Sequence, residues 1–84
     1  MESPRLFRLP AAVSSERAAA TAELVAAVEL VASGAARRVT IQGLDELEAV
    51  ASVGLARARA NGVAFAVMRD ADGRAHVLVG PRLR

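Results

Sequence analysis

The C-terminal part of this 84-residue chain holds two apolar segments separated by a short polar one. Residues 63–68 (VAFAVM) and 75–79 (AHVLV) are rich in β-branched and apolar side chains, as strands are. Between them lies DADGR, in which Asp72 and Gly73 favour a tight turn because they tolerate a positive φ. This pattern predicts an antiparallel hairpin, against which the rest of the chain has to pack.

Two further short segments are expected to be strands. Residues 38–42 (RVTIQ) alternate between polar and apolar side chains with a period of two, so that Val39 and Ile41 point toward the helices. Residues 5–9 (RLFRL) are interpreted as a first strand, which Pro10 ends. Each of these two strands is followed by a segment with helical signals.

The first helix is expected to begin near two candidate N-caps, Ser14 and Ser15, and to reach about Ser33. Gly34 follows as its C-terminal stop. Apolar residues lie on more than one side of this helix, which predicts that the helix is covered on more than one side.

The second helix lies within residues 43–62 (GLDELEAVASVGLARARANG), where Gly54 would permit the close approach of a neighbouring element. Asp45 as N-cap and Glu48 three positions later have the arrangement of a capping box. A helix N-terminus that follows a strand is a natural phosphate site. Here, however, the carboxylates of Asp45, Glu46 and Glu48 can themselves interact with the positive end of the helix dipole. We therefore expect this helix start to be closed to phosphate.

These elements predict a single α/β domain over residues 1–84, a two-layer α+β sandwich of order βαβαββ. Its four-stranded sheet should carry both helices on one face. A core of this size stabilises a monomer only marginally, and the chain has no cysteine to form a disulfide. Because both faces of the strand at residues 63–68 are apolar, a homodimer is expected.

The residue types give little support for catalysis, so we expect no enzyme activity, no metal and no cofactor. His76 is the only histidine and lies mid-strand, without the partners that a general base needs. Residues 70–73 (DADG) resemble the start of a calcium loop, but the later ligands are missing. No apolar run has transmembrane length and the N-terminus lacks the apolar core of a signal peptide, so a cytoplasmic protein without a membrane partner is expected.

Arginine supplies all 11 basic residues, and nine carboxylates oppose them, which leaves a net charge of only +2. This balance alone does not predict nucleic-acid binding. The candidate phosphate-binding residues are arginines on the hairpin and toward the chain ends: Arg69, Arg74, Arg8, Arg17 and Arg82. They would contact phosphates without reading bases, so binding should be salt-sensitive and nearly sequence-independent.

Several short motifs occur in order between Gly34 and the C-terminus. They are Gly34-Ala35-Ala36; Val39-Thr40-Ile41 followed by Gly43; Ala49-Val50, Val53, Leu55, Ala56 and Arg57; Asn61-Gly62-Val63; and Val77-Leu78-Val79-Gly80-Pro81-Arg82. Together they resemble the Alba superfamily and, within it, the stage V sporulation protein S family. Small apolar residues dominate each motif, so their order and spacing carry the resemblance.

The resemblance implies a non-enzymatic, dimeric regulator that binds DNA or RNA through the loop after the first strand, the loop into the second helix, and the hairpin. Two of these places depart from the family. Leu44 and Glu48 stand where Alba is basic, and residues 10–13 (PAAV) stand where relatives carry lysine. Three functions stay open: weak nucleic-acid binding, a protein–protein assembly module that has lost it, and binding of a small anionic ligand such as a nucleotide.

Overall fold

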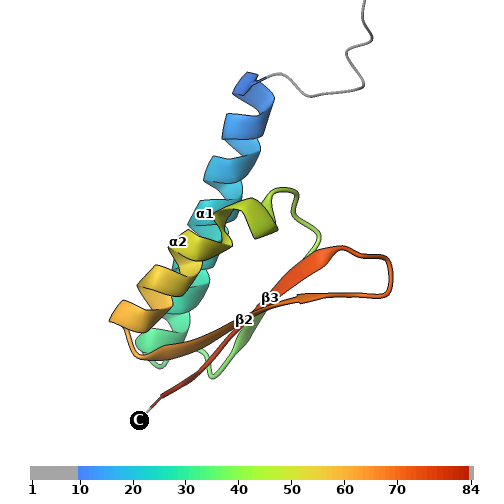
Figure 1. Cartoon of the computed structure of the whole chain (residues 1–84). Coiled ribbons are helices and arrows are strands. Elements are labelled where there is room, and N and C mark those ends of the chain that lie inside the picture. The colour runs from blue at the N-terminus through green and yellow to red at the C-terminus, as the bar shows by residue number, and fades with distance from the viewer. Residues whose placement is uncertain (1–9, 84) are drawn as a thin grey trace, which may run out of the picture.

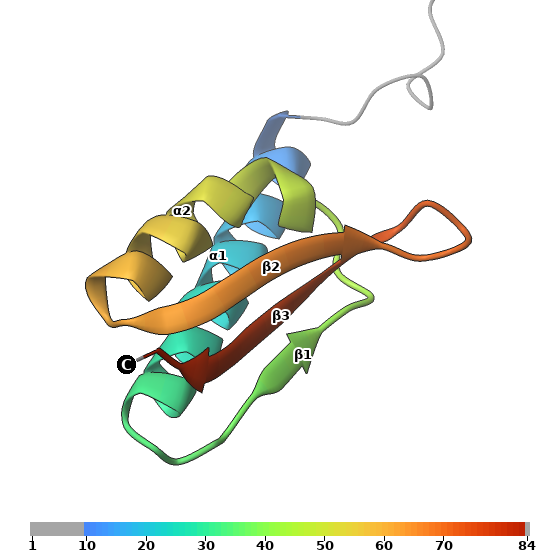
Figure 2. The same cartoon turned by 60° about the horizontal axis from the view of Figure 1, so that its bottom comes forward.

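The computed structural model describes residues 10–83, which form an α+β domain. Its elements are α1 (Pro10–Ala32), β1 (Val39–Ile41), α2 (Leu47–Ala60), β2 (Val63–Arg69) and β3 (Ala75–Arg82). The three strands form one antiparallel sheet in the order β1-β3-β2, and both helices lie on the same side of it (Figures 1 and 2). The two layers and the order αβαββ agree with the prediction for this part of the chain. The predicted first strand, residues 5–9, lies outside the described residues.

The predicted hairpin is confirmed as β2 and β3, joined by a tight turn. The Gly73 N–H donates to the Asp70 carbonyl at 2.9 Å, and the Asp70 N–H donates to the Arg74 carbonyl at 3.0 Å. Asp70 Oδ1 accepts the N–H groups of Asp72 and Arg74 at 2.9 and 3.0 Å. The Asp70 carboxylate thus holds the turn. Within residues 10–83, no group of three or more potential metal-ligating His, Cys, Asp or Glu side chains occurs.

The core lies between the sheet and the helices. Its largest fully buried side chains are Leu24, Leu47, Val28, Val31, Val77 and Val79. Val79 of the central strand lies opposite both Val39 of β1 and Phe65 of β2, and residues paired in this way share one face of the sheet. The close approach predicted at Gly54 is confirmed, since a Cβ built there would lie 2.7 Å from Cζ of Phe65.

The first helix begins earlier than predicted. α1 starts at Pro10 rather than near Ser14 and Ser15, so residues 10–13 form its first turn and not a loop. Proline suits this position because its fixed φ matches a helix and its missing N–H would have no intrahelical acceptor. Gly34 follows the helix end, as predicted. No helix in the described part of the chain is long and apolar enough to cross a membrane.

The capping box predicted at the start of α2 is wrong. The helix begins at Leu47, and its N-cap is Glu46, which has a left-handed φ of 68° and no side-chain capping hydrogen bond. Asp45 therefore lies outside the helix, and Glu48 lies one position too early to complete the box. Both carboxylates lie beside arginines of the hairpin instead. Glu48 forms an ion pair with Arg69, and a charged donor makes a stronger hydrogen bond than a backbone N–H, whereas Asp45 is only within the outer limit of an ion pair with Arg74.

Candidate functional site

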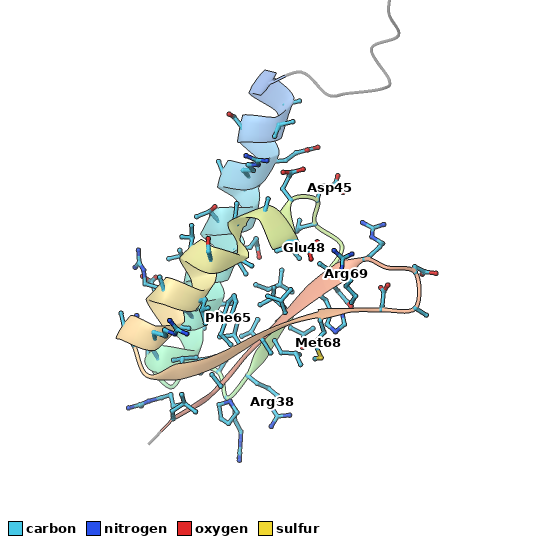
Figure 3. The ribbon with its side chains drawn as sticks, viewed as in Figure 1. Arg38, Asp45, Glu48, Phe65, Met68 and Arg69 are labelled. Atoms are coloured by element: carbon cyan, nitrogen blue, oxygen red, sulfur yellow. The ribbon has the colours of Figure 1, made fainter. Side chains whose placement is uncertain are left out.

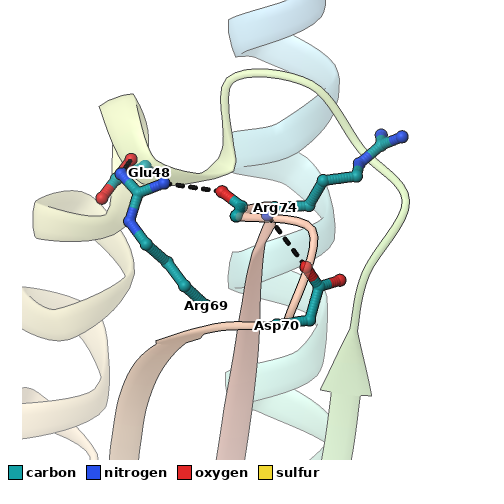
Figure 4. A network of polar contacts seen from close by, with 5 residues as sticks. Glu48, Arg69, Asp70 and Arg74 are labelled. Carbon is teal, nitrogen blue, oxygen red and sulfur yellow. Dashed lines mark hydrogen bonds and ion pairs between the residues drawn. The ribbon is translucent and has the colours of Figure 1, made fainter.

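The arginines predicted on the hairpin, Arg69 and Arg74, lie beside the start of α2 (Figures 3 and 4). Arg69 forms an ion pair with Glu48 through Nη2 and donates from Nη1 to the Gly73 carbonyl at 2.7 Å. Arg74 Nη2 is 4.0 Å from Asp45 Oδ1, which is the outer limit of an ion pair. Both arginine side chains are more than half exposed, at 56% and 60%, but each has a carboxylate beside it.

Arg17 extends this arrangement to α1. Its Nε lies 2.8 Å from Oε1 of Glu46, whose side chain is only 13% exposed. We use the term hairpin cluster for the six residues Arg17, Arg69, Arg74, Asp45, Glu46 and Glu48. The structure therefore brings three of the predicted arginines together. Their charges are offset one for one by carboxylates, so the hairpin cluster has no net positive charge to offer a phosphate.

Arg82, another predicted residue, lies at the opposite end of the sheet, in the last position of β3. The antiparallel register places this strand end beside the residues that lead into β1, which are Arg37 and Arg38. The backbones approach closely here, since a Cβ built at Gly80 would lie 2.5 Å from the carbonyl oxygen of Arg37. Arg8, the remaining predicted residue, lies outside the described residues.

We use the term basic end for Arg37, Arg38 and Arg82. Arg37 and Arg82 share a shallow hollow, and Arg38 points away from the helices (Figure 3). The lining residues of the hollow are Val31, Gly34, Ala36, Arg37, Pro81 and Arg82. All three arginines of the basic end are exposed, and none of them has an ion pair with any other residue in the range 10–83.

The two arginines of α2 differ from each other. Arg57 Nη1 lies 3.6 Å from Oε2 of Glu29, which joins α2 to α1. Arg59 is exposed and has no ion pair within the described residues. Both lie in the last turn of the helix, where a positive charge offsets the negative end of the helix dipole.

The basic end is not evident as a unit in the sequence. Arg37 and Arg38 precede one strand and Arg82 ends another, and only the pairing of β1 with β3 makes them neighbours. The usable signals were the alternation of residues 38–42 and the apolar, β-branched composition of residues 75–79, because each predicts a strand. The order of these strands in the sheet is a tertiary property that neither signal specifies.

Comparisons with protein-family models, with curated proteins and with solved structures found no match. In residues 10–83 the chain is a small α+β domain with two helices and a three-stranded antiparallel sheet.

Proposed function

We propose that this protein is a small non-enzymatic regulator that binds the phosphate backbone of nucleic acid through its basic end. One observation carries the proposal. Arg37, Arg38 and Arg82 are exposed without a carboxylate partner in the range 10–83, whereas each arginine of the hairpin cluster has one. A guanidinium that is not held in an ion pair keeps its planar set of donors for phosphate oxygens.

Binding through this surface should be weak and nearly independent of sequence. Three arginines on one duplex would give a slope of log affinity against log salt of about −2.7, and on a single strand about −2.1. Base stacking would need an exposed aromatic ring, and the one phenylalanine within residues 10–83, Phe65, instead packs against Gly54. Contacts of this kind position a protein on the backbone but do not read base edges.

An Alba-like regulator related to the stage V sporulation protein S family fits this proposal. The order αβαββ and the motifs between Gly34 and Arg82 support it, and residues 5–9 would add the fourth strand. The contact surface would differ from that of the family. The loop before α2 carries Asp45 and Glu46 here, so phosphate contact would move to the opposite end of the sheet.

Fluorescence anisotropy of a labelled duplex of about 20 base pairs, and of the matching single strand, tests the proposal. The variant Arg37→Ala/Arg38→Ala should reduce the salt slope by about two and weaken binding at low salt. The matched control is Arg69→Ala/Arg74→Ala, which removes the same formal charge from the hairpin cluster. It should leave the salt slope unchanged. The opposite pattern would refute the basic end as the contact surface.

A second candidate is a small phosphate-bearing ligand, and the hollow that Arg37 and Arg82 share favours it. A nucleoside monophosphate and inorganic phosphate, added as competitors in the same assay, separate the two. If the site binds nucleic acid, the mononucleotide or phosphate should displace the labelled probe only at concentrations far above those at which an unlabelled strand displaces it. If the mononucleotide instead binds as tightly as the strand, the small-ligand function is correct. If no anion binds even at low salt, an assembly module remains.

A further inference from the structure

The sheet has a second face that no other part of residues 10–83 covers. Both helices lie behind the sheet in Figure 2, on the side where Ile41, Val77 and Val79 are buried. Successive side chains of a strand point to opposite faces, so the residues next to these three point away from the helices. Figure 3 shows Met68 and Arg38 on this outward side.

The register places five outward residues next to one another. Thr40, Leu78 and Ala66 lie opposite one another in a row across the three strands, and His76 lies opposite Met68 in the next row. Residues paired in this way have Cβ atoms about 4.5–5.5 Å apart. We use the term open face for these five residues. Its centre is apolar and accessible, since Ala66 is exposed and Met68 is 39% exposed.

The charge around the open face is positive. Arg38 precedes Thr40 by two residues and points away from the helices, so it joins the open face to the basic end (Figure 3). Every carboxylate side chain between residues 10 and 83 belongs to a helix, to the loop before α2 or to the hairpin turn, and none to the open face. This combination favours a ligand that carries both apolar groups and phosphates.

Single-stranded nucleic acid offers these groups together, whereas a duplex does not. The bases of a single strand can be unstacked and laid against a protein surface. In a duplex the bases are reached only through the grooves. The major groove, about 12 Å wide, admits an α-helix or a two-stranded ribbon. The open face spans three strands with two helices behind them, so it is too broad to enter that groove.

We propose that the open face binds the unstacked bases of a single strand whose phosphates are held by the basic end. This inference rests on the proposed function and names single-stranded nucleic acid as the ligand class. Leu78 and Met68 contact the faces of the bases, while the Thr40 hydroxyl and the His76 ring offer hydrogen bonds to base edges. Apolar contact with a base face is available to every base, so the open face selects single strands rather than one sequence.

Fluorescence anisotropy with three labelled probes of about 20 nucleotides or base pairs tests the proposal. The probes are an oligothymidine, a duplex, and an abasic strand that keeps the sugars and phosphates but lacks the bases. The oligothymidine should bind at least about tenfold more tightly than the abasic strand, and more tightly than the duplex. Equal binding of the oligothymidine and the abasic strand would overturn the proposal and leave the phosphate contact standing. Binding of none of the three would refute the proposed function as well.

A pair of charged variants locates the contact. Ala66→Glu puts a carboxylate at the centre of the open face and should weaken oligothymidine binding at least about tenfold, because the carboxylate repels the phosphates. Its binding to the duplex should change little, which also shows that the variant is folded. Ala56→Glu is the matched control, since Ala56 is exposed on α2 in the other layer, and it should change neither affinity. Equal effects of the two variants on oligothymidine binding would contradict the proposal.

A neutral variant separates the apolar contact from the charge. Met68→Ser removes an exposed apolar side chain, so it should weaken oligothymidine binding without changing the slope of log affinity against log salt. Unchanged affinity would argue against base contact at Met68. Sedimentation equilibrium of Ala66→Glu identifies a different occupant. If this variant dissociates a wild-type dimer while its oligothymidine binding stays intact, a second copy covers the open face and the proposal is wrong.

Discussion

Gly80 is the residue on which the geometry of the basic end depends most. Its φ is +96°, and a Cβ at this position would lie 2.5 Å from the carbonyl oxygen of Arg37 and 3.1 Å from Cα of Arg38. Both contacts are with backbone atoms, which cannot rotate away as a side chain would. An alanine here would therefore have to push the segment before β1 away from the end of β3.

The cost of Gly80→Ala has two parts. A positive φ costs an alanine about 1–2 kcal/mol. Forcing a methyl group into occupied space costs about 1–3 kcal/mol more. The sum, about 2–5 kcal/mol, is a large share of the roughly 5–15 kcal/mol that holds a domain folded.

Gly34→Ala is the matched control. Gly34 has a φ of +84°, but apart from its own atoms and those of its two chain neighbours no atom lies within 4 Å of the point where the added methyl carbon would lie. It should carry only the first part of the cost, about 1–2 kcal/mol. Urea unfolding followed by circular dichroism measures both variants, since the chain has no tryptophan or tyrosine for fluorescence. If Gly80→Ala is no less stable than Gly34→Ala, the close packing at the basic end is refuted.

Three further predictions concern the core and the hairpin cluster. Leu24→Ala should lower the free energy of unfolding by about 2–5 kcal/mol in the same urea assay, because Leu24 is fully buried. Leu30→Ala should cost much less, since Leu30 is 45% exposed; equal losses would contradict the assigned core. Gly54→Ala gains about 1 kcal/mol of helix propensity but should lose about 1–3 kcal/mol through its clash with Phe65. Adding Phe65→Leu should recover part of that loss in a double-mutant cycle, and strict additivity would argue against the contact. Arg69→Ala should change stability by no more than about 1 kcal/mol, because its ion pair is exposed, and a larger loss in urea unfolding would contradict this.

The sequence predicted those parts of the fold that depend on local chemistry. The hairpin followed from Asp72 and Gly73 between two apolar runs, and the end of the first helix followed from Gly34. The start of that helix was missed because Ser14 and Ser15 are good caps, yet Pro10 and the alanines after it continue the helix without a penalty.

The candidate site was harder to predict because it depends on which residues meet across the fold. The sequence showed acidic residues before α2 and arginines on the hairpin, but it did not show that Glu48 would meet Arg69. It also did not show that the register of β1 with β3 would bring Arg37 close to Gly80. Charge pairing between distant segments is set by tertiary packing, and no local pattern encodes it.

The most direct test of the central claim is a titration of the isotope-labelled protein with unlabelled duplex, followed residue by residue through its backbone amide resonances. We expect the amides of residues 36–39 and of Gly80, Arg82 and Leu83 to shift as duplex is added, while those of residues 44–48 and 69–74 stay in place. Shifts confined to residues 44–48 and 69–74 would contradict the claim, and would mean that phosphate displaces the carboxylates of the hairpin cluster.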